Sequence, residues 1–254
     1  MDNTFHATGF YDKIADKYNW FFSSRDRIME SESAEIGSIL REHAVKTVLD
    51  CSCGDGLQSI ALARRGYTVT GSDISSGMIE RARCYAKEAG VTIRFEQADF
   101  RELEKNFPDQ YDCVLSWGNA IPHLMTETDI YRALSGIYGR TTAGGIAVIE
   151  MRNYDKMLQD RPRFHPMRIH DVRDGFRYSI LYVFDYFPDR IRFNVVYLME
   201  NLETGEKRME QEAVDYNPIQ KENFTQYLQN AGFCDITVRE NDRNICYIAQ
   251  KGVS

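Results

Sequence analysis

The chain has 254 residues, of which 43% are hydrophobic and 27% charged, and its formal net charge is −7. This composition is typical of an acidic globular protein with a sizeable core, built as one α/β domain with an insertion or as two domains. It excludes a membrane-spanning helix, because no segment approaches the ~18 consecutive apolar residues that a bilayer requires. It also disfavours a nucleic acid as the main partner, because Lys and Arg never form runs longer than two. We therefore expect a small molecule as the partner.

The first residues and the cysteines bear on the cell compartment. Residues 1–20 lack a basic region followed by an apolar stretch, which argues against secretion and favours the cytoplasm. The six cysteines are scattered through segments with a core-like pattern, and they form neither the C-x-x-C pairs of a zinc site nor a disulfide framework. We expect reduced thiols and no metal site.

The chain begins with an aromatic segment. Within residues 1–30 the aromatic side chains are Phe5, Phe10, Tyr11, Tyr18, Trp20, Phe21 and Phe22. So many rings in a terminal segment indicate that it folds over another part of the molecule or over a ligand. From about Ser31 the spacing of Ile36, Ile39 and Leu40 predicts a helix.

Strand and helix patterns then alternate. Strands are predicted at residues 46–50, 67–73, 91–97, 111–116 and 145–151, and helices at 57–65, 75–88 and 128–139. Gly66 and Gly90 end the first two of these helices. The alternation predicts a parallel sheet with right-handed crossovers.

After Asn153 the pattern changes. Residues 161–173 are basic and are interpreted as a solvated loop that contains His165 and His170. Residues 176–187, 190–201 and 207–216 are rich in aromatic and β-branched residues with turns between them, which predicts an antiparallel meander. A helix at 221–231 and strands at 233–240 and 244–251 complete the first sheet with an antiparallel edge. The predicted fold is α/β: a doubly wound, mostly parallel seven-stranded sheet with an antiparallel β-meander insertion.

A glycine-containing turn, Asp50–Gly56, lies between the first strand and its helix, where doubly wound folds open their ligand crevice. Glycine there lets the backbone approach a ligand closely. Asp73 ends the second strand, from which a carboxylate can accept both hydroxyls of an adenosine ribose, and Asp99 follows the third strand, within reach of an adenine edge. Each acid alone is also explained as a helix N-cap, but two acids at consecutive strand ends favour a nucleoside site.

Two cofactor-binding motifs are absent, and their absence limits which nucleoside cofactor the chain is expected to bind. Ser59 stands where a dinucleotide fingerprint requires a third glycine, and no phosphate-loop pattern ending in G-K-[ST] is present. With this loop and these acids, the chain resembles the class I methyltransferases that use S-adenosyl-L-methionine. The resemblance covers residues 45–152 and the C-terminal hairpin, which Ala231-Gly232-Phe233 signals. The resemblance implies a Rossmann-like methyltransferase fold and that cofactor.

The same resemblance implies an organisation and a set of cofactor contacts. It divides the chain into an aromatic lid at 1–30, a cofactor-binding core at 31–152, an insertion over the acceptor pocket at 153–218 and a C-terminal helix and hairpin at 219–254. Arg27 is expected on the cofactor's own carboxylate. The full set of expected cofactor contacts is Tyr11, Trp20, Arg27, Asp50, Ser52, Gly54, Asp73, Ile74, Met78, Asp99, Phe100, Trp117 and His123.

Two further segments are similar to the glycine N-methyltransferases and the glycine/sarcosine N-methyltransferases. They are S-W-G-N-A-I-P-H-L at 116–124 and E-M-R-N-Y-D at 150–155. The similarity implies that Arg152 grips the carboxylate of an amino-acid acceptor, that Asn119 lines the same pocket, and that Tyr216, in a Y-N-P element, belongs to the catalytic site. It implies N-methylation of glycine, sarcosine or a similar small amino acid, and it allows a homo-oligomer.

The residues themselves leave alternatives open. Arg152 is also compatible with an ion pair to Asp155 or Glu150, Asn119 with a helix cap, and His123 with packing or with a catalytic base. Methyl transfer from a sulfonium mainly requires alignment and exclusion of water, so no base and no metal is assigned. The pattern would also suit a methyltransferase for another small hydroxyl or amine, or a non-catalytic S-adenosylmethionine-binding protein.

Overall fold

The computed structural model describes residues 7–253, and Phe5 of the predicted lid lies outside this range. The helices are α1 (Ala7–Ile14), η1 (Ala15–Phe21), α2 (Arg25–Glu42), α3 (Leu57–Arg64), α4 (Ser76–Ala89), η2 (Phe100–Glu102), α5 (Leu103–Asn106), η3 (Ile121–His123), α6 (Glu127–Arg140), α7 (Tyr154–Asp160) and α8 (Lys221–Asn230). The strands are β1 (Thr47–Asp50), β2 (Thr68–Asp73), β3 (Arg94–Gln97), β4 (Tyr111–Ser116), β5 (Thr141–Arg152), β6 (Phe164–Arg173), β7 (Phe176–Tyr186), β8 (Ile191–Asn201), β9 (Lys207–Tyr216), β10 (Phe233–Glu240) and β11 (Asn244–Lys251). None of these helices has the length and apolar character of a membrane span.

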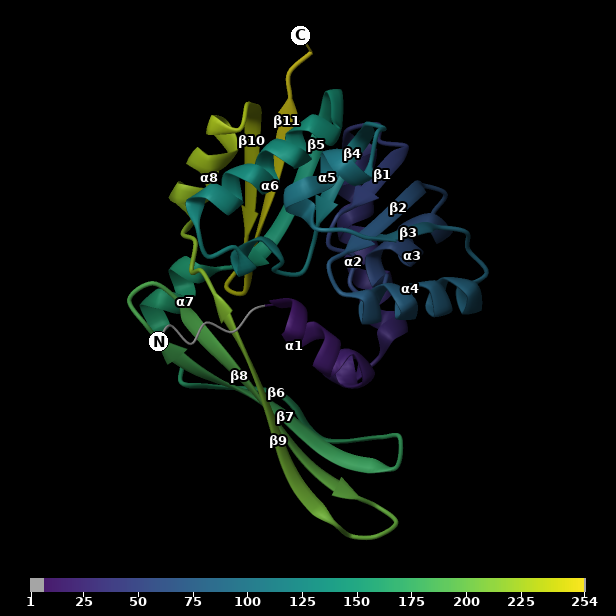
Figure 1. Ribbon diagram of the computed structural model, residues 1–254, viewed down its shortest axis with the longest axis vertical. Helices are drawn as coiled ribbons and strands as arrows, with labels where there is room; N and C mark the ends of the chain where they lie inside the picture. The colour runs from purple at the N-terminus through teal and green to yellow at the C-terminus, as the bar shows by residue number, and fades with distance from the viewer. Residues whose placement is uncertain (1–6, 254) are drawn as a thin grey trace.

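A seven-stranded sheet, sheet A, forms the centre of the larger lobe, with the strand order β10-β11-β5-β4-β1-β2-β3 (Figure 1). Strands β1 to β5 are parallel to their neighbours, and β11 runs antiparallel to β5 and β10. The predicted fold class is confirmed. The register sets Asp50 beside Gly71 of β2 and Leu115 of β4, so the carboxyl ends of these three strands meet at one edge. The strand order reverses at β1, and this reversal is where open α/β sheets bind ligands.

Helices cover both faces of sheet A because successive side chains of its buried strands point to opposite faces. On one face, Ala147, Ile149 and Met151 of β5 pack with α6 and α8 in the largest apolar cluster. On the other, Ile146 and Val148 pack against α2 and α3. A strand buried on both faces has a continuous apolar run in its sequence, which is why β4 and β5 were predictable.

The second sheet, sheet B, is antiparallel throughout, with the order β6-β7-β8-β9. Three of its strands match the predicted meander. The prediction that residues 161–173 form a loop is wrong, because 164–173 form β6. Register shifts after Pro166 and Arg168 and a positive φ of 55° at His170 interrupt the alternation that would have indicated a strand.

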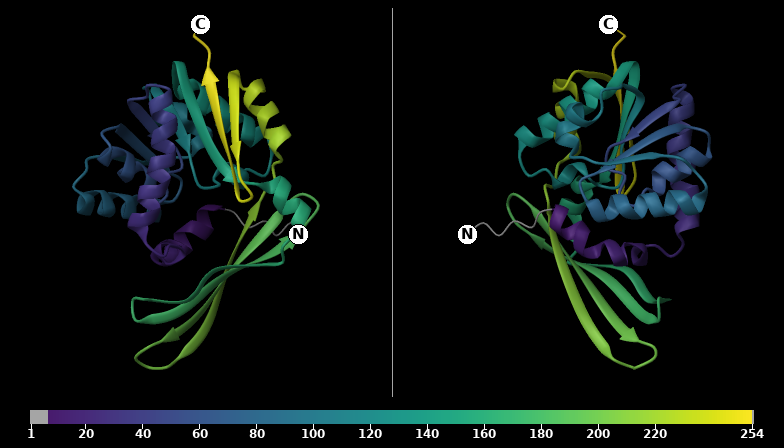
Figure 2. Two further views of the ribbon diagram at one scale, coloured as in Figure 1. Left: turned by 180° about the vertical axis from the view of Figure 1, so that it is seen from behind. Right: turned by 45° about the vertical axis from the view of Figure 1, so that its right-hand side comes forward.

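The aromatic N-terminal segment lies between the two sheets. Figures 1 and 2 show α1 and η1 beneath the carboxyl edge of sheet A and against sheet B. Trp20 stacks on Tyr178 of β7 with ring centroids 4.5 Å apart, while the hydroxyl of Ser75, which caps α4, donates to Asp12 of α1. The segment therefore joins the sheets and covers the ligand edge of sheet A.

The cysteines only partly follow the sequence interpretation. Cys51, Cys53, Cys113 and Cys246 are buried as free thiols, as their apolar surroundings predict. Cys84 and Cys234 are free but exposed, which contradicts the expectation that all six lie in the core. They occupy the solvent sides of α4 and the edge strand β10, where the flanking residues gave no clear apolar pattern.

Candidate functional site

The loop between β1 and α3 contains two glycines with different roles. Gly54 has a φ of 53°, and a Cβ built on it would meet nothing within 4 Å, so open space lies in front of this backbone. Gly56 has a φ of 81°, and a Cβ there would lie 3.0 Å from Ala82 and 3.2 Å from Phe95. Gly56 thus permits close packing of the loop, whereas open space lies in front of the backbone at Gly54.

Asp73, at the end of β2, turns its carboxylate toward the same loop. One oxygen accepts a hydrogen bond from the backbone amide of Gly54 at 2.9 Å, and the other accepts one from the amide of Ser75 at 3.0 Å. Burial raises the pKa of Asp73 although the backbone amides oppose the rise. A carboxylate has about four lone-pair positions, so two remain for hydroxyl donors.

Asp50 lies below the loop as a support. It is 1% exposed, and one of its oxygens accepts a hydrogen bond from the hydroxyl of Ser59 at 2.7 Å. Its other oxygen has no partner among the described residues, and burial raises the pKa of Asp50 to about 7. Ser52 reaches across to β4, where its hydroxyl lies 3.0 Å from that of Ser116.

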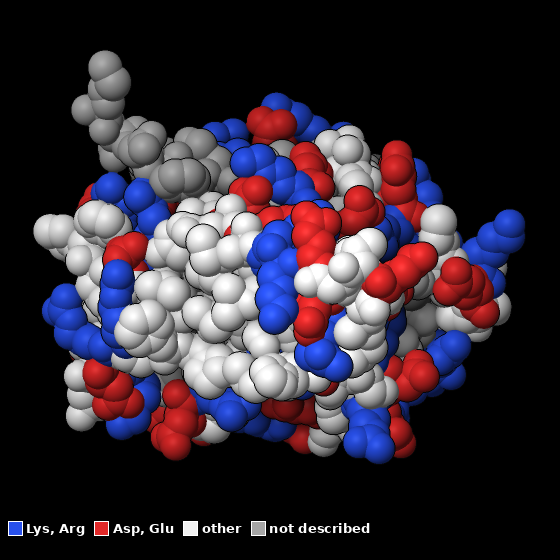
Figure 3. All heavy atoms as spheres, turned by 90° about the horizontal axis from the view of Figure 1, so that it is seen from below, with Lys and Arg blue, Asp and Glu red and all other residues white. Residues whose placement is uncertain are grey.

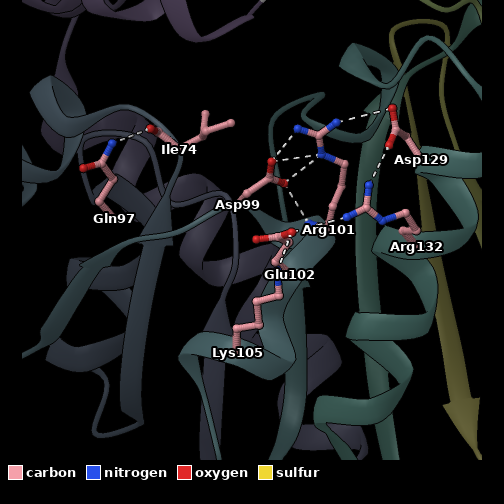
Figure 4. A network of polar contacts seen from close by, with 8 residues as sticks. All are labelled: Ile74, Gln97, Asp99, Arg101, Glu102, Lys105, Asp129 and Arg132. Atoms are coloured by element: carbon pink, nitrogen blue, oxygen red, sulfur yellow. Dashed lines mark hydrogen bonds and ion pairs between the residues drawn. The ribbon is translucent and has the colours of Figure 1, made fainter.

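Asp99 is engaged by a neighbouring arginine (Figure 4). Nε of Arg101 donates to both carboxylate oxygens, at 3.0 Å to Oδ1 and 2.9 Å to Oδ2, and Nη2 donates to Oδ2 at 2.5 Å. Arg101 also forms an ion pair with Asp129 of α6 at 3.3 Å. Burial opposes ionisation of Asp99, but the hydrogen bonds from Arg101 outweigh it and its pKa is lowered. Asp99 also accepts from the Arg101 amide as the N-cap of η2, so the capping alternative is what the structure shows.

The N-terminal segment brings a different arginine to the loop from the one expected. The guanidinium of Arg25 forms an ion pair with Asp55, donates to the Asp55 carbonyl at 3.1 Å and lies 4.2 Å from the ring centroid of Tyr85. Arg27 is exposed, two residues further along α2. One turn of a helix spans 3.6 residues, so side chains two apart point to different sides.

The remaining expected cofactor contacts divide between the crevice and the cores. Tyr11 lies over the crevice, and its hydroxyl is 3.1 Å from Nε2 of His123. Met78 is buried in the first turn of α4, directly behind the loop. Trp20 packs on sheet B, and Trp117 packs with the core of sheet A. The last two positions are Ile74, whose carbonyl accepts from Gln97, and Phe100, which packs against the apolar cluster beneath α6.

Arg152, at the end of β5, lies in aromatic surroundings. Its guanidinium carbon is 5.2 Å from the ring centroid of Phe193 and 5.5 Å from that of Tyr182, both on sheet B. No carboxylate among residues 7–253 lies within ion-pair distance of it, although Glu150, two residues earlier on β5, acts on its charge from further away. Asp155, one of the alternative partners, instead accepts from the backbone amide of Lys221 at 2.8 Å. The site therefore contains a half-buried cation without an ion pair, in a position where an anionic ligand would supply one.

Asn119 holds the backbone beside this cation. Its amide oxygen accepts from the Arg152 amide at 3.0 Å, and its side chain bonds the hydroxyl of Tyr154 at 3.1 Å. Asn119 has a φ of 72° and follows Gly118, which has a φ of 87°. Asparagine tolerates this left-handed conformation better than most residues. It links the ends of β4 and β5 and the start of α7.

A row of aromatic rings leads from Arg152 to the N-terminal cover. Phe193 lies 4.6 Å from Tyr216, Tyr216 lies 4.3 Å from His123, and the His123 ring lies 5.5 Å from Tyr11. Burial lowers the pKa of His123 to about 3, so the imidazole is neutral near pH 7 and a poor proton acceptor. The rings form a continuous packed row between the guanidinium of Arg152 and α1.

Several contributors to this site were not identified from the sequence. Tyr182 and Phe193 were interpreted as part of a generic aromatic meander, because only their position near the end of β5 in space distinguishes them. Arg25 lay two residues from the expected arginine. Tyr154 stood inside the R-N-Y-D run, which was the one available signal.

Metal ligands do not gather in this region. Within residues 7–253, no three His, Cys, Asp or Glu side chains are placed to hold a metal ion. The geometry offers a glycine loop with a carboxylate beside it and, at the end of β5, a guanidinium without an ion pair, from which a row of rings runs to α1.

Comparison with known proteins agrees with this geometry. Residues 48–145 match the family model of a methyltransferase domain. The chain is 35% identical over 130 residues to a glycine/sarcosine N-methyltransferase of Parasynechococcus marenigrum, covering 51% of this chain and 46% of that protein. It is 27% identical over 235 residues to a glycine/sarcosine N-methyltransferase of Aphanothece halophytica, covering 91% and 81%. The aligned part thus spans about half the length of the first relative.

A solved structure extends the likeness to the whole fold. An S-adenosylmethionine-dependent methyltransferase from Clostridium acetobutylicum superposes with a TM-score of 0.77 at 16% identity, covering 95% of this chain and 99% of that one. This likeness includes both sheets and supports the arrangement of the fold.

Glu150, beside Arg152 on β5, provides a test of the burial at this site. Burial and the carboxylate of Glu32 raise its pKa to about 8, from an ordinary value of 4.5. Between pH 4.5 and pH 8 this carboxyl group is protonated in the folded state and ionised in the unfolded state. The free energy of unfolding therefore falls as pH rises through this range, by up to ~1.4 kcal/mol for each pH unit. We expect Glu150→Gln to match the wild type near pH 5 and to be more stable than the wild type above pH 8, in urea unfolding followed across pH 5–9.

Glu42→Gln is the matched control, because Glu42 is exposed and its pKa is lowered by a hydrogen bond from Arg239. It should leave the change of stability between pH 5 and 9 unaltered. If Glu150→Gln keeps the same fall in stability as the wild type, Glu150 does not carry the proposed buried proton.

Proposed function

We propose that this chain, which contains a methyltransferase domain at residues 48–145, is an S-adenosylmethionine-dependent N-methyltransferase acting on glycine, sarcosine or a similar small amino acid. The observation that carries the choice of acceptor is the guanidinium of Arg152, which has aromatic neighbours and no carboxylate counter-ion among the described residues. The names of the relatives and the run from Arg152 to Asp155 support the same class of substrate.

The residues at the glycine loop fit the cofactor. The open space before Gly54 allows the ligand to lie against the backbone, and Asp73 keeps lone pairs for the ribose hydroxyls. Arg25, at the same loop, takes the role expected of Arg27 toward the cofactor's carboxylate. Arg101 already donates to the Asp99 carboxylate, so Asp99 can accept a hydrogen bond from an adenine edge only through its remaining lone pairs. When bound, S-adenosylmethionine supplies a methyl group activated on a sulfonium.

The acceptor end of the site selects for a carboxylate. An arginine presents planar, paired donors that stay charged at any relevant pH, so it orients a carboxylate as well as attracting it. The gain in binding free energy is large because the carboxylate of the acceptor supplies the counter-ion that the guanidinium lacks. Asn119 and Tyr154 act through the Arg152 backbone, whose position they fix.

The remaining residues of the site align the acceptor and exclude water. Tyr11, Tyr216 and neutral His123 close the space between loop and guanidinium without offering a charge. An amine nucleophile must be unprotonated, and surroundings that lack a carboxylate favour its neutral form. The site therefore selects a neutral amine from solution, and no general base is required.

The proposed activity is tested with purified protein, labelled S-adenosylmethionine and a panel of acceptors. Transfer is expected to glycine, sarcosine or dimethylglycine and not to glycinamide or methylamine, because the last two lack the carboxylate that Arg152 binds. Labelled product is counted after separation from the cofactor. Transfer to glycinamide as fast as to glycine would contradict the acceptor assignment, and no transfer to any amine would contradict the activity.

Substitution of Arg152 should separate acceptor binding from cofactor binding. Arg152→Ala is expected to raise the acceptor KM by about 100-fold, because a charge-assisted, paired contact is lost, while the Kd for S-adenosylhomocysteine stays within about twofold. Arg152→Lys should recover only part of the loss. Arg161→Ala is the matched control, since that exposed guanidinium lies 4.9 Å from the ring of Tyr186 outside the site. Equal losses of both affinities would place Arg152 elsewhere in the mechanism.

Asp73→Asn should weaken cofactor binding specifically. We expect a loss of about 10- to 100-fold in affinity for S-adenosylhomocysteine by calorimetry, because hydrogen bonds to a charged group contribute about 1.5–3 kcal/mol. Asp112→Asn is the matched control, because Asp112 likewise accepts from two backbone amides, Lys46 and Thr47, at 2.9 Å each. It lies at the opposite edge of sheet A, so it should leave this affinity unchanged. A similar loss in both variants would show that Asp73 acts only through loop stability.

A further inference from the structure

Asp99 stands beside Asp73 at the ligand edge of sheet A, since the backbone amide of Ala98 donates to the Asp73 carbonyl at 3.0 Å. Its carboxylate, which is 23% exposed, is held by three N–H groups of Arg101. The backbone amide donates to Oδ1, Nε to both oxygens and Nη2 to Oδ2, all at 2.5–3.0 Å. A carboxylate offers about four lone-pair positions, so about one is left for a ligand.

Arg101 is itself fixed from its other side (Figure 4). Its Nη1 forms an ion pair with Asp129 of α6 at 3.3 Å. The backbone amide of Asp129 donates to the hydroxyl of Thr126, the residue that caps α6, at 3.2 Å, so Asp129 has a defined position. A guanidinium is planar and its donors have fixed directions. The carboxylates at its two ends therefore determine its plane, and with it the orientation of the Asp99 carboxylate.

This arrangement exceeds what surface charge or helix capping requires. On the face shown in Figure 3, Lys and Arg side chains commonly lie beside Asp and Glu, and exposed pairs of this kind contribute little to stability. Capping η2 needs only the bond from the Arg101 backbone amide to Asp99. The guanidinium adds contacts to both oxygens of a half-buried carboxylate. Burial acts to raise the pKa of Asp99, but the hydrogen bonds from Arg101 lower it below its ordinary value.

We propose that Arg101 is a positioning residue for recognition of the cofactor's base. It holds the Asp99 carboxylate so that the lone pair left free accepts a hydrogen bond from the 6-amino group of adenine. This role of Arg101 rests on the proposed function, in which Asp99 lies at the adenine edge. The 6-amino group is the hydrogen-bond donor of a base whose ring nitrogens are acceptors, so a fixed carboxylate favours adenine over a purine that lacks this group. Arg101 acts through Asp99 and needs no contact with the cofactor.

A chemical double-mutant cycle tests this role, with affinities measured by calorimetry on the full chain. The two ligands are S-adenosylhomocysteine and its analogue with purine in place of adenine, which lacks only the 6-amino group. The wild type is expected to bind S-adenosylhomocysteine about 10- to 100-fold more tightly than the analogue, because the analogue loses a hydrogen bond to a charged group. Arg101→Ala should reduce this preference to about threefold or less, while its affinity for the analogue stays within about threefold of the wild type. General loosening of the structure would weaken both ligands alike, so the preference isolates positioning.

Three further variants identify the path through which Arg101 acts. Asp99→Ala should lose the preference to the same extent, and Arg101→Ala combined with Asp99→Ala should lose no more of it than either alone. Arg101→Lys should keep an intermediate preference, because an ammonium retains the charge without the paired, planar donors. Arg132→Ala is the matched control, because Arg132 belongs to the same network but contacts Asp129 and Glu102 instead of Asp99. It should preserve the wild-type preference.

The outcomes separate this role from the proposed function. An Arg101→Ala protein that binds both ligands more weakly but keeps the wild-type preference overturns the role of Arg101, and so does a wild type without any preference. In either case, binding of S-adenosylhomocysteine and methyl transfer to a small amino acid would still stand. A wild type that binds neither ligand overturns the cofactor site and the role of Arg101 together. Melting temperatures without ligand show that each variant is folded, and Arg101 is 32% exposed, so its truncation leaves no buried cavity.

Discussion

A half-buried positive charge without an ion pair is the constraint on which the candidate site depends. Arg152 lies between two rings of sheet B, and no carboxylate within residues 7–253 pairs with it. Leaving such a charge unpaired costs free energy, so the site favours a ligand that carries an anionic group. A carboxylate of a small amino acid, the acceptor proposed above, would meet that need with paired hydrogen bonds.

Both sheets are required to create this environment. Sheet A supplies Arg152 at the end of β5 and the loop at the end of β1, because parallel strands bring their carboxyl ends to one edge. Sheet B supplies Phe193 and Tyr182, and η1 fixes it in place through the contact of Trp20 with Tyr178. The N-terminal segment therefore holds the two lobes together, and its Tyr11 hydroxyl lies 3.1 Å from Nε2 of His123.

Sheet B illustrates how one element can serve two surfaces. Alternation along a strand sends Phe193 and Tyr197 inward and Val196 and Leu198 outward, so the same strand builds the site and the apolar outer face.

The sequence alone determined the features that depend on local pattern. The apolar runs of β4 and β5 and the glycines after the helices predicted the parallel sheet, and the turn at Gly54 and the acid at Asp73 predicted where a nucleoside would lie. Strand β6 could not be predicted, because its bulges at Pro166 and Arg168 hide the alternation. Tertiary structure alone decided that Arg25 rather than Arg27 reaches the loop, that Asp99 is paired with Arg101, and that Arg152 has rings around it and no ion pair among the described residues. The physical reason is that a side chain's partners are set by residues distant in sequence, whereas strands, turns and caps are set by residues a few positions away.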